Sequence, residues 1–355
     1  MKKMSKKLLK KLSEVNGVPG NEYLVANLIK DEIKDLVTEV KQDNLGSVIG
    51  HKKGNGPNIL IGGHMDEVGL MVKSITKEGF IKFQTLGGWY SQVMLAQEWQ
   101  IITKKGVIIG VTGSKPPHII PLEQRKQAAK IEDMYLDIGV KNKEEAVELG
   151  IEPGNMVTPL QEFKELGNKN YLLGKAWDNR IGSAVVIEVL NNLKNEKLNN
   201  NLFGAFTVQE EVGLRGAKTT SYMVEPKIAF AIDTGLGNDV PGSVSEEQTL
   251  GNGPQILLFD GGLVAHRGLR EFVINVAKEL EIPYQEGVIN GGRTDAGEMH
   301  LAHHGAAALS ICIPTRYMHS HTSIIHYEDY LNTVKLMTEV IKRLDEKTVN
   351  EILFK

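Results

Sequence analysis

Residues 181–193 read IGSAVVIEVLNNL, and residues 202–208, a few positions later, read LFGAFTV. The first segment has the length of a buried helix, and the second has the length and composition of a buried strand. Residues 227–232 (KIAFAI) predict another strand, and residues 269–280 predict another helix. Helices and strands that alternate in this way favour a parallel α/β sheet.

The N-terminal region has a similar pattern of helices followed by strands. Between residues 6 and 36 the apolar residues recur at helical spacing, and residues 17–20 (GVPG) interrupt them. We therefore expect two helices there. Residues 37–40, 47–49 and 59–61 are short β-branched segments separated by turn-forming residues, and they predict the first strands of the sheet.

The middle of the chain has a different pattern, in which strands alternate without long helices. Residues 99–103 and 107–111 flank a Lys-Lys-Gly turn, which is typical of a β-hairpin. We expect residues 70–168 to form a small β-rich domain. This domain would be inserted into a mostly parallel, doubly wound α/β domain built from residues 1–69 and 169–355.

Composition and charge exclude several classes of protein. The chain has 355 residues, which corresponds to about two domains, and its 41 basic and 44 acidic residues give a net charge of only -3. Such a balance gives no general attraction for phosphate backbones, so we expect no nucleic-acid partner. No apolar run approaches the ~20 residues that cross a bilayer, so we expect no membrane association. The single cysteine, Cys312, cannot form an intramolecular disulfide, and a reducing cytoplasm fits this composition.

Residues that commonly bind metal ions follow four of the predicted strands. They are His64 after residues 58–63, Glu210 and Glu211 after 202–209, Asp233 after 227–232, and His319 after 306–313. Ligands of parallel α/β sheets bind outside the carboxyl ends of the strands, so these side chains are expected to share one crevice. Asp178, which precedes the helix at 181–193, is a fifth candidate ligand.

Two imidazoles and three carboxylates suit a borderline divalent cation such as Zn, Co or Mn. The absence of thiolate ligands argues against a closed structural zinc site. Two ions fit this number of ligands better than one, because Asp178 can bridge them while each ion keeps one histidine and one further carboxylate. A position is then left for water, which the ions would acidify toward neutrality.

Each candidate also has a simpler structural interpretation. Asp178 can cap the helix that follows it, Asp66 can form a turn, and His319 can be an ordinary structural histidine. Glu210 and Glu211 can be a solvated pair, the usual fate of adjacent glutamates. Their position after a buried strand argues against this, and neighbouring residues in extended backbone point in opposite directions. One glutamate can therefore bind metal while the other moves protons.

Several segments of the chain resemble a known family over nearly its whole length. These are residues 62–69 (GGHMDEVG), 176–182 (AWDNRIG), 208–217 (VQEEVGLRGA), 232–233 (ID), 291–297 (GGRTDAG) and 314–320 (PTRYMHS). They closely resemble the dinuclear-metal TET aminopeptidases, also known as glutamyl or deblocking aminopeptidases. Some bacterial members of that family carry the name cellulase or endoglucanase.

The resemblance implies a fold like that of the zinc exopeptidases and a role for each matching residue. It places His64, Asp178 and Asp233 around one metal ion, and Asp178, Glu211 and His319 around the other. It makes Glu210 the general base and Asp66 the residue that orients His64.

The implied reaction is removal of N-terminal residues from short peptides by a metal-activated water. The resemblance also implies that the inserted domain mediates dimerisation and that dimers assemble into dodecamers. Two other functions remain open at this stage. A glycoside hydrolase of the endoglucanase type would need two carboxyl groups across the scissile bond and has no use for two histidines and a bridging aspartate. A metal-stabilised scaffold would need no open coordination position.

Overall fold

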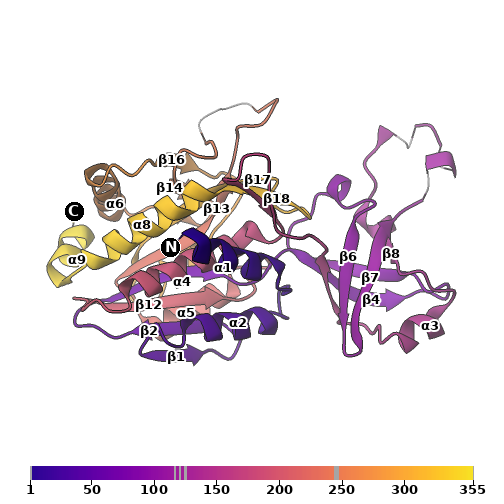
Figure 1. Ribbon diagram of the computed structural model, residues 1–355, viewed down its shortest axis with the longest axis horizontal. Coiled ribbons are helices and arrows are strands. Elements are labelled where there is room, and N and C mark those ends of the chain that lie inside the picture. The colour runs from indigo at the N-terminus through magenta and orange to yellow at the C-terminus, as the bar shows by residue number, and fades with distance from the viewer. Residues whose placement is uncertain (1, 116, 120, 124–125, 244–247, 355) are drawn as a thin grey trace.

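The computed structural model describes residues 2–115, 117–119, 121–123, 126–243 and 248–354. Figure 1 shows a large α/β unit on the left and a smaller β unit on the right. In the part of the chain that is described, no helix is long and apolar enough to cross a bilayer.

The large unit is built on one mixed sheet of twelve described strands. The main path of the sheet runs β1 (Glu39–Gln42), β2 (Val48–Lys52), β12 (Asn201–Thr207), β3 (Asn58–His64), β13 (Ile228–Leu236), β17 (Ala307–Arg316), β18 (Ser323–His326), β11 (Tyr171–Gly174) and β10 (Lys164–Glu165). A branch beside β17 contains β14 (Gln255–Asp260), β15 (Leu263–Val264) and β16 (Gln285–Val288).

The parallel pairing lies in the middle of this sheet. Strands β12, β3, β13 and β17 are parallel neighbours, and β14 pairs in parallel with β16. The strands at the edges, including β1, β2, β18, β11 and β10, pair in antiparallel fashion. The predicted α/β class with an added small β domain is confirmed. The sheet is mixed and not mostly parallel, because parallel pairing is limited to its four central strands and to the β14–β16 pair.

Helices cover both faces of the sheet, as expected for a doubly wound arrangement. The helices are α1 (Lys2–Glu14), α2 (Tyr23–Ile33), α4 (Trp177–Leu193), α5 (Arg215–Val224), α6 (Arg267–Glu279), α7 (Ala296–Met299), α8 (Tyr327–Lys342) and α9 (Glu346–Leu353). Helix α4 contacts β3 and β13 and is itself covered by α1, α2 and α8, whereas α5 and α7 pack together beside β3 and β13. The sequence of α4 is apolar on almost every side because the helix is enclosed on almost every side.

Alternation along the strands separates the two layers of the core. Ile59 and Ile61 of β3 belong to the large cluster that includes α4, whereas Leu60 belongs to the smaller cluster that includes α5 and α7. Successive side chains of a strand point to opposite faces, so one apolar strand supplies both layers. This explains why the central strands appear as continuous apolar runs in the sequence.

The smaller unit is a closed six-stranded barrel. Its strands are β4 (Gly69–Ile75), β5 (Ile81–Leu86), β8 (Tyr135–Asp137), β7 (Gly106–Gly113), β6 (Glu98–Thr103) and β9 (Met156–Pro159), in that spatial order. The core of the barrel includes Val72, Trp99, Ile101 and Leu136. Short helices complete this unit: α3 (Lys143–Glu148) and 3₁₀ turns at Ser91–Val93, Pro117–Ile119 and Ile131–Asp133.

The chain leaves the large unit once and returns to it once. It enters the barrel at β4, directly after the segment that follows His64, and leaves it after β9. Strand β10 pairs with β11, so the chain has rejoined the large sheet by Lys164. The division into domains at residues 69/70 and 168/169 stays a prediction.

Candidate metal centre

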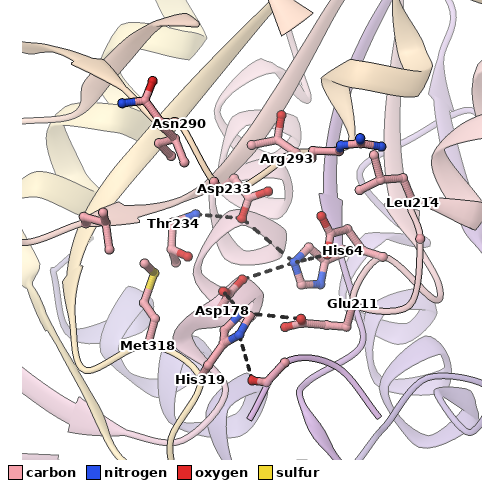
Figure 2. Close-up of a pocket in the computed structure, with 18 of the residues that line it drawn as sticks. His64, Asp178, Glu211, Leu214, Asp233, Thr234, Asn290, Arg293, Met318 and His319 are labelled. Atoms are coloured by element: carbon pink, nitrogen blue, oxygen red, sulfur yellow. Dashed lines mark hydrogen bonds and ion pairs between the residues drawn. The ribbon is translucent and has the colours of Figure 1, made fainter. Parts of the chain in front are cut away.

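The predicted ligands gather in one cavity of about 790 Å³ at the carboxyl ends of the parallel strands. Its lining includes His64, Asp178, Glu211, Asp233 and His319, together with Glu210. Figure 2 shows their side chains converging from different elements. The strand ends differ from the expected pattern in one case, because β13 continues past Asp233 to Leu236.

Asp178 lies between the two histidines. Its Oδ1 atom is 3.1 Å from His64 Nε2, and its Oδ2 atom is 3.3 Å from His319 Nε2. Asp233 Oδ1 lies 3.9 Å from His64 Nε2, and Glu211 Oε2 lies 3.4 Å from His319 Nε2. Asp178 is thus shared by the two histidines (Figure 2), and Glu210 Oε2 also approaches His64 Nε2, at 3.7 Å.

Asp178 is free for this position because another residue caps the helix. Asp178 and Asn179 have non-helical backbone angles, and the buried Oδ1 of Asp178 accepts no hydrogen bond from the described residues. Asn179 takes that role, since its Oδ1 accepts from the amide of Gly182 at 3.0 Å. The Nδ2 of Asn179 donates to Ile232 O at 2.7 Å and so fixes the start of α4 beside Asp233. The interpretation of Asp178 as a helix cap is therefore wrong.

His64 is fixed by close contact between β3 and α4. A side chain on Gly63 would come within 2.7 Å of the backbone of Gly182 and Ser183. The glycine therefore lets the helix approach the strand next to the histidine. The hydroxyl of Ser183 donates to His64 O at 3.1 Å, which ties the two elements together at this point.

Asp66 holds the site in a different way from the one expected. His64 Nδ1 lies 3.0 Å from the main-chain oxygen of Asp66 and 3.6 Å from its carboxylate. The carboxylate instead accepts the backbone amides of Glu210 and Glu211, each at 3.1 Å. Asp66 therefore orients His64 through its backbone and positions both glutamates through its side chain.

The barrel supplies one contact to the centre. His319 Nδ1 lies 3.0 Å from the carbonyl oxygen of Gly88, in the loop after β5. The neighbouring Trp89 packs against Trp99 of the barrel and against the buried ring of His321. The second histidine is therefore oriented by a carbonyl from the other unit, which leaves its Nε2 directed at Asp178 and Glu211.

The charges around the site suit a divalent cation. Burial and the charge of Asp178 raise the pKa of Glu211 to about 8, although His319 opposes this. Burial also raises the pKa of Asp233 well above its usual value. Burial alone would lower the pKa of His319, but Asp178 and Glu211 raise it to about 9. Crowded carboxylates of this kind are stabilised when a metal ion supplies positive charge.

Buried carboxylate oxygens without a hydrogen bond also indicate a site for a divalent cation. Asp178 Oδ1 and Glu211 Oε1 are buried and accept no hydrogen bond from the described residues. Ligand atoms of His64, Asp178 and Glu211 lie within 4.8 Å of one another, as do those of His64, Glu210 and Asp233. The donor set therefore fits metal ions. Because Glu210 lies in one of these groups, distances alone do not separate a base from a ligand.

Sequence reasoning missed the residues that support the ligands. Glu67, Lys175 and Arg180 form a buried ionic cluster behind the site, and Asp295 is buried and accepts from the hydroxyl of Thr207. Burial raises the pKa of Asp295 to about 6. For two of them the sequence offered a signal, because Glu67 directly follows Asp66 and Arg180 lies two positions after Asp178.

We expect Asp66→Asn to lower metal affinity or activity about 10- to 100-fold, the usual effect of removing a supporting contact around a metal site. The amide keeps the volume of the side chain but presents an NH₂ group to one of the two backbone amides. Metal titration and kcat/KM measure the effect. Asp345→Asn is the matched control, because Asp345 also accepts a backbone amide, from Thr348, at the start of α9. Equal effects of the two substitutions would contradict the role given to Asp66.

Comparisons with known proteins find relatives along most of the chain. The sequence profile of the M42 glutamyl aminopeptidase family matches residues 46–336. A glutamyl aminopeptidase of Lactococcus lactis is 34% identical over 97% of this chain and 98% of its own length. A lysyl aminopeptidase of Pyrococcus furiosus is 34% identical over 95% and 96%, respectively.

Solved structures give the same result. A TET aminopeptidase from a marine sediment thaumarchaeote superposes with a TM-score of 0.97 at 41% identity, over 99% of both chains. The TET1 peptidase of Pyrococcus horikoshii, which assembles into a tetrahedron or an octahedral shell, gives 0.86 at 34% identity over 96% of this chain and 100% of its own. A Thermotoga maritima protein called an endoglucanase gives 0.78 at 28% identity over 97% and 99%.

Proposed function

This chain belongs to the M42 glutamyl aminopeptidase family and is a peptide hydrolase, and from that premise we propose how its residues perform the reaction. His64, Asp178 and Asp233 hold one divalent ion, and Asp178, Glu211 and His319 hold a second. Zn or Co is the expected metal, with Mn as a further possibility. The observation that carries this assignment is the position of Asp178, which has one carboxylate oxygen near each histidine.

Bound divalent ions would acidify a water molecule and polarise the scissile carbonyl. Glu210 is the general base, and its carboxylate takes the proton of the attacking water and returns it to the leaving amine. Asp66 supports this step because its carboxylate fixes the backbone amides of Glu210 and Glu211. The two adjacent glutamates thus have different functions, one in proton transfer and the other in metal binding.

The substrate is a short peptide with a free N-terminus. Its free amine could bind a divalent ion or a carboxylate of the cavity such as that of Glu210. An internal peptide bond offers no free amine, which favours cleavage of terminal residues over internal ones. A metal-stabilised scaffold would need neither this cavity nor a general base beside the ligands.

The name of the Thermotoga relative does not favour a glycosidase function for this chain. Glycosidases need an acid and a base or nucleophile on either side of the scissile bond. Here Glu211 Oε2 lies 3.4 Å from His319 Nε2, and Glu211 belongs to a group of residues that suits a metal ion. Its carboxyl group is therefore not free to act as a glycosidase acid or base. We therefore assign peptide hydrolysis alone.

The TET1 relative forms closed shells, and we propose the same kind of assembly here. The barrel within residues 70–168 would mediate dimers, and the dimers would form a dodecamer. The cytoplasm is the proposed location, since the composition fits a reducing compartment.

Elemental analysis of metal-saturated, desalted protein tests the metal assignment. We expect about two divalent ions per chain, because five ligands with one shared carboxylate serve two ions. Asp178→Ala should weaken the binding of both ions, whereas Asp345→Ala should weaken neither. One ion per chain with full activity would contradict the proposal.

A further inference from the structure

The cavity that contains the metal centre extends into an apolar region. Leu236, Val288, Ile289 and Met318 belong to its lining. Leu236 is 50% exposed and Val288 is 48% exposed, so with Ile289 and Met318 they present apolar surface to the cavity. Apolar surface that opens into a binding site is a candidate for contact with an apolar part of the ligand.

These side chains are attached to the elements that carry the site. Leu236 is the last residue of β13, three positions after Asp233, and Met318 directly precedes His319. Val288 is the last residue of β16, and the amide of the following Ile289 is bonded to Phe259 of β14 at 3.0 Å. Leu236 and Val288 therefore end strands, and Ile289 and Met318 lie just beyond the ends of β16 and β17, so the wall is anchored close to the reacting centre.

Apart from Arg293, the acidic and basic residues of the described lining are those of the centre itself, which are the proposed ligands and Glu210. Arg293 is the one lysine or arginine of the described lining. Figure 2 shows it on the side of Leu214, away from Met318 and Thr234, and its stem approaches Gly261 and Gly262. Arg316, near Leu236 in the fold, is paired with Asp239 through contacts of 3.0 and 2.5 Å. The nearby polar lining residues Thr234 and Asn290 are uncharged, so a charged side chain placed against the apolar wall would find no counter-charge there among the described residues.

We propose that this wall receives the side chain of the N-terminal residue, and that the enzyme prefers uncharged aliphatic residues such as leucine and methionine over glutamate and lysine. The inference rests on the proposed function, because attack on the first peptide carbonyl at the metal centre decides where the side chain of the N-terminal residue lies. Burial of an aliphatic side chain against the wall should favour that substrate about 10- to 100-fold in kcat/KM over a substrate whose side chain stays exposed to water. A charged side chain has the added cost of losing water without gaining a partner.

Aminoacyl chromogenic substrates of leucine, methionine, glutamate and lysine, assayed on the metal-saturated enzyme, test the preference. We expect kcat/KM for leucine and methionine to exceed the values for glutamate and lysine at least tenfold. Free leucine should also inhibit more strongly than free glutamate. Preference for glutamate or lysine would overturn this inference alone, whereas failure to hydrolyse any of the four would contradict the proposed function as well.

Two variants separate the apolar wall from other causes of preference. Leu236→Lys places a cation on the wall and should raise the glutamate-to-leucine ratio of kcat/KM about tenfold or more. Val264→Lys is the matched control, because Val264 is 74% exposed and lies outside the cavity. Size-exclusion chromatography checks that both variants keep the assembly of the wild type. An unchanged ratio in Leu236→Lys with intact assembly would overturn the inference.

Discussion

Glu210→Gln is expected to keep both metal ions and to lose about two to four orders of magnitude in kcat, the usual contribution of a general acid–base residue. Glutamine preserves the size of the side chain but cannot take a proton. The backbone of residue 210 stays fixed, because its amide donates to Asp66 and not to a group that the substitution removes. Elemental analysis and steady-state kinetics on the same sample measure both parts of the prediction.

Glu211→Gln is the matched comparison for this variant. Glu211 Oε2 lies 3.4 Å from His319 Nε2, so the substitution should lower metal content as well as activity. Loss of metal in Glu210→Gln together with full metal content in Glu211→Gln would mean that the two roles are reversed. This comparison is needed because Glu210 also lies within ligand distance of His64 and Asp233.

Glu67→Gln is expected to lower the free energy of unfolding by about 3 to 5 kcal/mol, the typical cost of removing one partner from a buried ion pair. Glu67 accepts from Lys175 at 2.5 and 2.7 Å and lies 3.4 Å from Arg180, and all three side chains are fully buried. The substitution would remove the carboxylate that pairs with Lys175, while the guanidinium of Arg180 keeps its bonds to the backbone oxygens of Leu12 and Val15. Denaturant unfolding at a fixed protein concentration measures the effect.

The deficit of Glu67→Gln should shrink as pH rises toward about 8. Burial lowers the pKa of Lys175 to about 8, although Glu67 opposes the shift. Without Glu67 the pKa falls further, so between that lower value and about 8 the folded variant has released this proton while the folded wild type still holds it, and the variant gains stability relative to the wild type. Glu152→Gln, which removes an exposed pair with Lys104 at 2.9 Å, is the control and should cost about 0 to 1 kcal/mol. Equal losses in the two variants would contradict the account of the buried cluster.

The convergence of the ligands could be predicted because one topological rule covers most of them. His64 and Asp233 lie on parallel strands of the same sheet, and residues after the neighbouring strands reach the same edge. The central strands were also recognisable, since burial on both faces gives them continuous apolar sequences. The antiparallel strands β18, β11 and β10 were not predicted. Each is only two to four residues long, and the pairing of β11 with β18 joins segments about 150 residues apart.

The contacts that orient the proposed ligands could not be predicted from the periodicity of the sequence. The hydrogen bond between Gly88 and His319 joins residues 231 positions apart and in different units of the fold. The choice between the carboxylate and the carbonyl of Asp66 at His64 depends on the path of a few backbone atoms. Helix capping by Asn179 instead of Asp178 depends likewise on a local change of backbone angles.

The central claim is that a free terminal amine directs this site to the first peptide bond. Mass spectrometry of timed digests, with one peptide in free and N-acetylated forms, tests it most directly. Loss of a charge-assisted contact costs about 1.5 to 3 kcal/mol, so the free peptide should be shortened from its N-terminus about ten to a hundred times faster. Carboxymethyl cellulose should be left intact. Internal cleavage products, or equal rates for the free and acetylated peptides, would contradict the account.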